Sequence, residues 1–149
     1  KERGTFLVAD IYNDDFIAAD QNGMPREFVL KEKHLGQRQR DSFAMAVKRG
    51  VRIAYGTDAG AYPHGDNAKQ FAYMVKYGMT PMQAIQSATV WAAELLGQED
   101  SLGSLAPGKL ADIIATAENP LKNIKALEDV SFVMKEGVIF KHTPSPCRI

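Results

Sequence analysis

The stretch that most constrains the fold runs from Val51 to Asp58 and reads VRIAYGTD. Its beginning is mostly apolar, β-branched or aromatic, which predicts a buried strand, and Gly50 ends the helix before it. Because side chains alternate along a strand, Asp58 shares a face with Gly56 and Ala54, whose small size leaves the carboxylate room. A carboxylate at the end of an apolar layer is costly unless it is paired, hydrogen-bonded or bound to a cation. The sequence therefore predicts a compensating group near Asp58, and a metal ion is one candidate.

Strands and helices alternate through the first part of the chain, which predicts an α/β fold. Thr80 and Gln83 have the capping-box spacing, with Pro81 at the first helical position, so a helix is expected to begin there. The elements expected in chain order are a strand at Thr5–Ala9, a loop from Asp10 to Gly23, a solvated helix over residues 30–49, a strand at Val51–Tyr55, a helix capped by Asn67 and ended by Gly78, and a helix from Pro81 to Leu96 closed by Gly97.

The sequence pattern changes after Gly97, where short apolar segments separated by Gly and Pro indicate strands. The expected strands are residues 111–115, 130–134 and 138–141, with Glu136-Gly137 as a tight hairpin turn. A domain boundary near residue 98 follows, with residues 1–97 in one domain and 98–149 in the next. Lys1 to Gly4 is typical of the last turn of a helix, so we expect the chain to be a piece of a longer protein.

Charge and cysteine content exclude several classes of partner and of structural site. The chain has 18 basic and 18 acidic side chains, so nothing indicates nucleic acid or an anionic membrane as a partner. Its one thiol, Cys147, rules out an internal disulfide or a cysteine-rich metal cluster within this chain. No apolar run approaches the roughly 20 residues that span a bilayer. We expect a soluble protein whose location stays open, with the cytoplasm favoured.

Each candidate site residue also has an interpretation without a functional role. Asp58 can be a functional carboxylate or can merely cap a turn by accepting backbone hydrogen bonds. His64, in a Pro-His-Gly loop, can be a solvated residue, a metal ligand or a donor to a substrate, and Tyr62 lies beside it. Asp10 is assigned only to the start of a loop. His34 and His142 are assigned to the surface without a role.

Five segments match a known family in order. They are GTDAG at 56–60, PHGxNA at 63–68, GMTPxxAI at 78–85, the stretch 88–97, and GSLAPGKxAD at 103–112. Together they resemble the C-terminal part of the amidohydrolase superfamily, in particular its imidazolonepropionase-like and Xaa-Pro dipeptidase (prolidase-like) members. The resemblance covers nearly the whole chain, but the chain covers only the last part of the family's length.

The resemblance implies a fold and a chemistry. Such enzymes are (β/α)8 TIM barrels fused to a small β-sandwich, so Thr5–Ala9 would be strand seven, 51–57 strand eight, and residues from about 98 onward part of the sandwich. One or two divalent metal ions, zinc being favoured, lie at the barrel mouth. Asp58 matches the strand-eight aspartate, which ligates metal and takes the proton of the water that attacks the amide carbonyl. His64 and Tyr62 would contact the substrate.

The family's other metal ligands lie on segments that this sequence does not contain. One carboxylate cannot hold a catalytic zinc, which needs about three protein ligands. The expected function is therefore the C-terminal segment of a metal-dependent hydrolase of a small peptide-type or cyclic amide substrate. The chain would be inactive without the complementary N-terminal portion.

Two alternatives remain from other classes. The first is a non-enzymatic packing or assembly module, whose open strand edges would be completed by another protein or by a second copy, giving a homo-oligomer. The second is a receiver-type phosphorylation domain with Asp58 as the acceptor. That alternative requires an acidic cluster and a suitably placed lysine, and the helix and sandwich signatures fit it poorly.

Overall fold

The computed structural model describes residues 3–19 and 23–143 of the 149-residue chain. The expected helical turn at Lys1–Gly4 lies partly outside these ranges, and Cys147 lies wholly outside them. The helices are α1 (Asn13–Ala18), α2 (Arg26–Lys48), α3 (Lys69–Lys76), α4 (Pro81–Ala88) and α5 (Val90–Leu95), with short 3-10 helices at His64–Asp66 and Ile124–Glu128. The strands are β1 (Leu7–Ala9), β2 (Ile53–Tyr55), β3 (Ile113–Thr116), β4 (Val130–Lys135) and β5 (Val138–His142).

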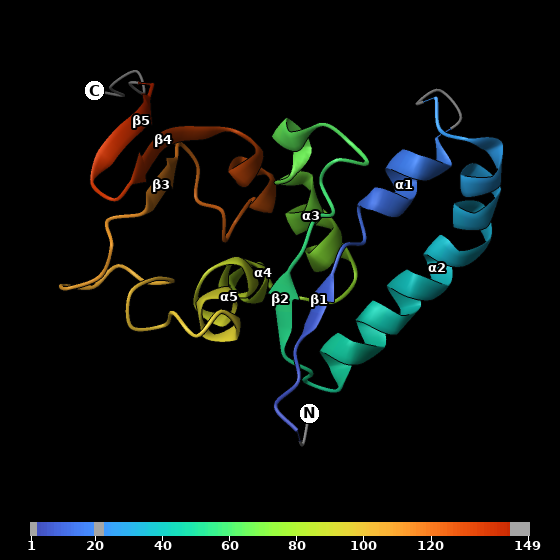
Figure 1. The fold of residues 1–149 in the computed structure, drawn as a ribbon, viewed down its shortest axis with the longest axis horizontal. Coiled ribbons are helices and arrows are strands. Elements are labelled where there is room, and N and C mark those ends of the chain that lie inside the picture. Colours follow the sequence, from blue (N-terminus) through green and yellow to red (C-terminus); the bar gives the residue numbers. More distant parts are fainter. Residues whose placement is uncertain (1–2, 20–22, 144–149) are drawn as a thin grey trace.

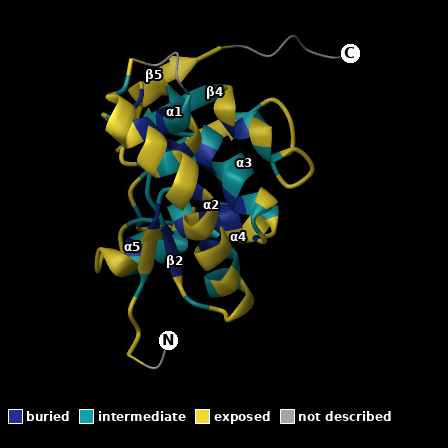
Figure 2. Cartoon of the chain, turned by 90° about the vertical axis from the view of Figure 1, so that its right-hand side faces the viewer, coloured by how far each residue is buried: buried dark blue, intermediate teal, exposed yellow. Residues whose placement is uncertain are grey.

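The first two strands form a parallel pair, with β1 beside β2 and α1 and α2 between them in the chain. Leu7 pairs with Ile53 and Ala9 pairs with Tyr55. Both predicted strands are confirmed, although each is two residues shorter at its start than the sequence indicates. Ile53 is completely buried and Ala54 is 2% exposed, and β2 is one of the dark-blue segments of Figure 2.

Helices cover the strand pair on both sides. Figure 1 shows α2 on one side of β1 and β2 and α4 and α5 on the other, with α3 above the strands in this view and the β3–β4–β5 sheet at the upper left. The apolar core fills the space between these layers and consists of Ala9, Ile11, Phe43, Ile53, Met74, Met79 and Ala84. Within the described part of the chain, no helix is both long and apolar enough to cross a membrane.

The predicted loop from Asp10 to Gly23 is wrong in part, because α1 occupies its middle. Six residues are too few for an isolated helix to be stable in water. Tertiary contacts supply the missing stability: Ile17 is buried, and Arg40 of α2 donates to a carboxylate oxygen of Asp15 at 2.5 Å. The next helix, predicted over residues 30–49, begins four residues earlier, directly after Pro25.

The predicted capping role of Asn67 is also wrong. Helix α3 begins at Lys69, and its cap position is Ala68, which makes no side-chain capping bond. Asn67 has helical dihedral angles (φ −51°, ψ −41°), whereas a capping side chain needs an extended backbone. Instead, the backbone oxygen of Asn67 accepts a hydrogen bond from the Tyr55 hydroxyl at 2.6 Å.

The capping box at Thr80 is confirmed, with both reciprocal bonds to Gln83 present. The helix expected to run to Leu96 is interrupted at Thr89, whose dihedral angles (φ −124°, ψ −97°) are not helical. The Thr89 hydroxyl donates to the Ile85 carbonyl, taking the place of its own N–H in the helical ladder. The sequence therefore forms two helices, α4 and α5, instead of one.

Gly103 packs against this break. A Cβ at this position would lie 2.8 Å from the Ala93 Cβ and 3.0 Å from the Thr89 carbonyl oxygen, and its φ is +84°. No other residue type can occupy that backbone position without strain, because a side chain would overlap the helices. The chain that leaves α5 is thus fixed against the helices before the last three strands begin.

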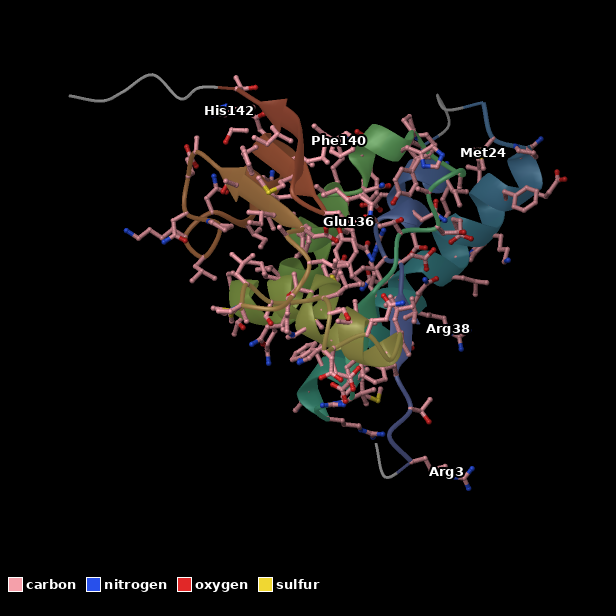
Figure 3. All side chains as sticks on the ribbon, turned by 60° about the vertical axis from the view of Figure 1, so that its left-hand side comes forward. Arg3, Met24, Arg38, Glu136, Phe140 and His142 are labelled. Carbon is pink, nitrogen blue, oxygen red and sulfur yellow. The ribbon has the colours of Figure 1, made fainter. Side chains whose placement is uncertain are left out.

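The last part of the chain forms an antiparallel sheet in the order β3-β4-β5. The Glu136-Gly137 hairpin is confirmed: both residues have positive φ, 50° and 81°, as a two-residue turn of this kind requires. The Asp112 side chain accepts a hydrogen bond from the Glu136 backbone N–H at 2.8 Å, which ties the turn to the start of β3. Figure 3 shows Phe140 on β5, where it is 70% exposed.

Candidate active site

Two carboxylates follow the C-terminal ends of the parallel strands. Asp10 comes directly after β1, and Asp58 comes three residues after β2. Because the strands are parallel, both lie at the same edge of the pair. Burial raises the pKa of Asp10, and the nearby charge of Asp58 raises it further. The structure therefore brings Asp10, which the sequence assigns only to a loop, into the same site as Asp58.

A glycine allows the two strand ends to approach. A Cβ on Gly56 would lie 2.7 Å from a methyl group of Val8 and 3.3 Å from the carbonyl oxygen of Ala9. The Gly56 N–H donates to that same oxygen at 3.2 Å, so the ladder extends one step beyond the last strand residues. A side chain here would displace Val8 and crowd the Ala9 carbonyl, which favours the glycine at the start of the GTDAG motif.

Asp58 has a left-handed backbone, with φ +48°. Aspartate tolerates this conformation better than most residues, but left-handed residues other than glycine are uncommon. Where they occur, they cluster at functional sites. The side chain is exposed. Among the described residues it accepts no hydrogen bond, so the carboxylate does not cap the turn and is available to a ligand.

Tyr62 lies against the same site. Its side chain is only 4% exposed and packs edge-on against the Tyr12 ring at 5.0 Å. Burial raises the pKa of Tyr62, and the charges of Asp10 and Asp58 contribute. Its hydroxyl lies near the Thr57 side chain but makes no hydrogen bond of acceptable geometry within the described ranges. The Tyr62 hydroxyl is thus a buried polar group beside two carboxylates and a candidate donor to a ligand.

His64 stands apart from these groups. It begins the short 3-10 helix after Pro63 and is exposed. In the part of the chain that the structure describes, it makes no hydrogen bond or ion pair with Asp58 or Tyr62. The structure therefore brings together Asp10, Asp58 and Tyr62, and leaves His64 on the loop nearby.

Sequence reasoning missed two buried polar residues behind the site. Arg40 belongs to a charge run expected to be solvated, yet it is 9% exposed and donates to the Ile11 carbonyl at 3.4 Å. Its guanidinium also lies 5.6 Å from the centre of the Tyr73 ring. Gln70 is completely buried under both strand ends. No local sequence pattern predicts the burial of either residue, because their hydrogen-bond partners are distant in sequence.

The described residues contain no group of three or more His, Cys, Asp or Glu that could hold a metal ion. Asp10 and Asp58 are oxygen donors of the kind that divalent ions accept, and neither has an ion-pair partner in the described ranges. A catalytic zinc needs about three protein ligands. These residues thus fit one part of a metal site and require ligands from elsewhere.

A cavity of about 320 Å³ lies at the other end of β2. Val51, Arg52 and Trp91 are among the residues that line it. It is therefore separate from the carboxylates, which lie past the opposite end of the strand.

Comparison with known proteins identifies the family. Residues 1–140 match the model of the Amidohydrolase family. The chain belongs to this family. The resemblance drawn from the sequence motifs is thereby confirmed, and the receiver-type alternative has no support.

Individual relatives agree with the family assignment. The chain is 37% identical to an ochratoxinase of Aspergillus niger over 147 residues, covering 95% of this chain and 30% of the relative. It is 34% identical to an imidazolonepropionase of Acinetobacter baumannii over 112 residues, or 68% of this chain and 26% of the relative. Among solved structures, an Xaa-Pro dipeptidase with methionine bound in the active site superposes with a TM-score of 0.87 at 44% identity, covering 94% of this chain and 35% of that one.

The chain thus spans about a third of the length of these relatives. It is a mixed α/β polypeptide that matches amidohydrolase structures over nearly all of its own length. The relatives' names describe hydrolases.

Proposed function

We propose that this chain is the C-terminal segment of a metal-dependent amidohydrolase that hydrolyses a peptide-type or cyclic amide bond. The observation that carries the proposal is the meeting of Asp10, Asp58 and the unpartnered Tyr62 hydroxyl at one edge of a parallel strand pair. Loops at the C-terminal ends of parallel strands are where barrel enzymes carry their chemistry. Similarity to an Xaa-Pro dipeptidase supports a dipeptide-like substrate.

The proposal includes a division of the chain. Residues 1–97 would be the last strands and helices of a (β/α)8 barrel, with β1 and β2 as strands seven and eight. Residues 98–149 would form part of a β-sandwich. The change from a parallel strand pair with helices to an antiparallel sheet supports this boundary.

Each site residue has a proposed task. Asp58 would ligate a divalent metal ion, zinc being favoured, and accept a proton from the attacking water. A bound divalent ion would polarise the amide carbonyl and lower the pKa of water. The Tyr62 hydroxyl would donate to the substrate, and His64 would contact it from the loop. The remaining metal ligands would come from a complementary N-terminal portion, without which this chain would be inactive.

Reconstitution tests the proposal. This chain is produced together with a complementary N-terminal portion bearing a His-x-His motif, and this assembly is called the complete enzyme below. We expect bound divalent metal and hydrolysis of the dipeptide Met-Pro or a related amide. Asp58→Asn should lower kcat by about 10²- to 10⁴-fold, the usual worth of a proton-transfer group.

A matched control is Asp66→Asn, which alters another aspartate of the same loop region that pairs instead with Lys69. It should leave kcat nearly unchanged. A correctly folded complete enzyme without metal and without activity on any dipeptide or amide would contradict the proposal. Full activity of Asp58→Asn would contradict the task given to that residue.

An assembly role without catalysis is the second candidate, and exposed apolar strands favour it. Val8 on β1 is 57% exposed and Phe140 on β5 is 70% exposed. Such surfaces are typical of interfaces. Native mass spectrometry separates the candidates: a companion chain with metal supports the hydrolase, whereas a metal-free homo-oligomer supports the assembly module.

A further inference from the structure

Gln70 is the second residue of α3, and its side chain is completely buried. A buried amide is costly unless its hydrogen bonds are made. Here every one is made. The side-chain oxygen accepts from the N–H groups of Ile11 at 3.0 Å and Tyr12 at 2.8 Å, and the NH2 group donates to the carbonyl oxygens of Ala9 at 2.7 Å and Gly56 at 2.8 Å.

These four partners lie on both strand ends. Ala9 is the last residue of β1 and is followed by Asp10, whose other neighbour, Ile11, is also bound by Gln70. Gly56 follows β2 directly and precedes Asp58 by two residues. The amide thus continues the hydrogen bonding just where the ladder of paired strand residues stops.

The pattern of partners selects glutamine. Two N–H donors must meet an oxygen, and two carbonyl acceptors must meet an NH2 group, so only one orientation of the amide satisfies all four. A glutamate could accept from Ile11 and Tyr12 but would face the two carbonyls with an oxygen. An apolar side chain of the same shape would leave all four backbone groups without a partner.

We infer that Gln70 is a positioning residue of the active site: by binding the backbone of both strand ends, it fixes the directions in which Asp10 and Asp58 leave the strands. This inference rests on the proposed function, in which Asp58 acts in catalysis. Gln70 itself does not reach the reacting atoms. The peptide of Gly56, held by the amide, sets the path of the chain into the left-handed conformation of Asp58.

The test compares Gln70→Met, Gln70→Glu and Ser87→Ala in the complete enzyme with Met-Pro as substrate. Ser87 is the matched control: it is also completely buried and donates to a backbone carbonyl, that of Ala84, but within α4. We measure the Tm of each variant, and then kcat and KM at a temperature well below the lowest of these Tm values. A misplaced catalytic group costs up to about 10²-fold in rate, so Gln70→Met should lower kcat by about 10- to 100-fold and change KM little.

Gln70→Glu keeps the acceptor half of the contacts and should restore part of kcat, whereas Ser87→Ala should lower Tm without lowering kcat. If Gln70→Met gives no folded enzyme, the comparison rests on Gln70→Glu, whose kcat should still lie below that of Ser87→Ala. Equal kcat in Gln70 variants and wild type, or an equal loss in Ser87→Ala, would overturn the inference alone. An inactive wild type would overturn the proposed function, and the inference with it.

Discussion

The Nε atom of Arg40 lies 3.8 Å from a carboxylate oxygen of Asp14, and both side chains are at least nine-tenths buried. This distance is too long for a hydrogen bond. The Arg40 Nε instead donates to the Ile11 carbonyl at 3.4 Å, and an Nη atom of Arg40 donates to Asp15 at 2.5 Å. Burial therefore dominates at Asp14 and raises its pKa to about 7, although the charge of Arg40 opposes the shift.

The raised pKa predicts a pH-dependent stability. Because folded Asp14 holds its proton up to about 7, whereas an unfolded aspartate releases it near about 4, its favourable contribution is full below the lower value and is lost as the pH rises through the higher one. Asp14→Asn cannot ionise. We expect the unfolding free energy of this variant, relative to wild type, to be about 1–2 kcal/mol more favourable at pH 8 than at pH 4, a figure reduced for solvent screening. Denaturant unfolding of the complete enzyme at both pH values measures the gap.

Asp15→Asn is the control with the opposite sign. Burial raises the pKa of Asp15, but hydrogen bonds from Tyr73 and Arg40 outweigh it and leave the pKa lowered. The ionised Asp15 therefore stabilises the fold above its unfolded pKa, and this stability is lost as the pH falls through the folded one. Asp15→Asn should lose stability relative to wild type at pH 8. A gap that does not change with pH in either variant would contradict these assignments.

Gly56→Ala should damage the strand pair. Its new methyl group would lie 2.7 Å from a side-chain methyl of Val8 and 3.3 Å from the Ala9 carbonyl oxygen, so the Val8 side chain and the end of the strand pair must shift. Overpacking of this kind costs about 1–3 kcal/mol. Gly65→Ala is the control, because open space surrounds that position and its backbone is not left-handed. Unfolding of the two variants, measured side by side, should show a loss only for Gly56→Ala.

Tyr62→Phe should separate activity from stability. The hydroxyl has no partner within the described ranges, so its removal should leave the unfolding free energy unchanged or slightly higher. If the hydroxyl donates to a charged group of the substrate, kcat/KM should fall by about 10- to 100-fold. Tyr55→Phe should show the reverse pattern, since its hydroxyl donates to the Asn67 carbonyl. Unchanged kcat/KM in Tyr62→Phe would remove Tyr62 from the site.

Thr80→Ala should cost about 1 kcal/mol, because it removes the side-chain cap of α4. Thr80→Ser keeps the hydroxyl that accepts from the Gln83 N–H and should lose much less. Urea unfolding of both variants tests this. Equal losses would show that the methyl group, and not the cap, stabilises this helix.

Sequence alone predicted the features that depend on near neighbours. The capping box at Thr80, the hairpin turn at Glu136-Gly137 and the strand that leads to Asp58 are all written within a few residues. Helix α1 was missed because a distant partner, Arg40, stabilises it. The break at Thr89 was missed because the bond from its hydroxyl to the Ile85 carbonyl also occurs in continuous helices, and the close approach of Gly103 cannot be read from the sequence.

The same distinction holds at the site. The position of Asp58 at a strand end could be predicted from local alternation and from the family motif. Its proximity to Asp10 depends on the pairing of strands more than 40 residues apart. Gln70 offers no pattern at all, because its partners are backbone groups and any sequence presents those.

The packing of Gly103 against the break between α4 and α5 limits where this chain can vary in length. The residues just before it, 98–100, are exposed, so extra residues can be inserted there as a surface loop. An insertion at Gly103 itself would move a larger residue into contact with Ala93 and Thr89 and would shift the start of the following sheet. Insertions between the helices and the last strands should therefore accumulate on one side of a single glycine.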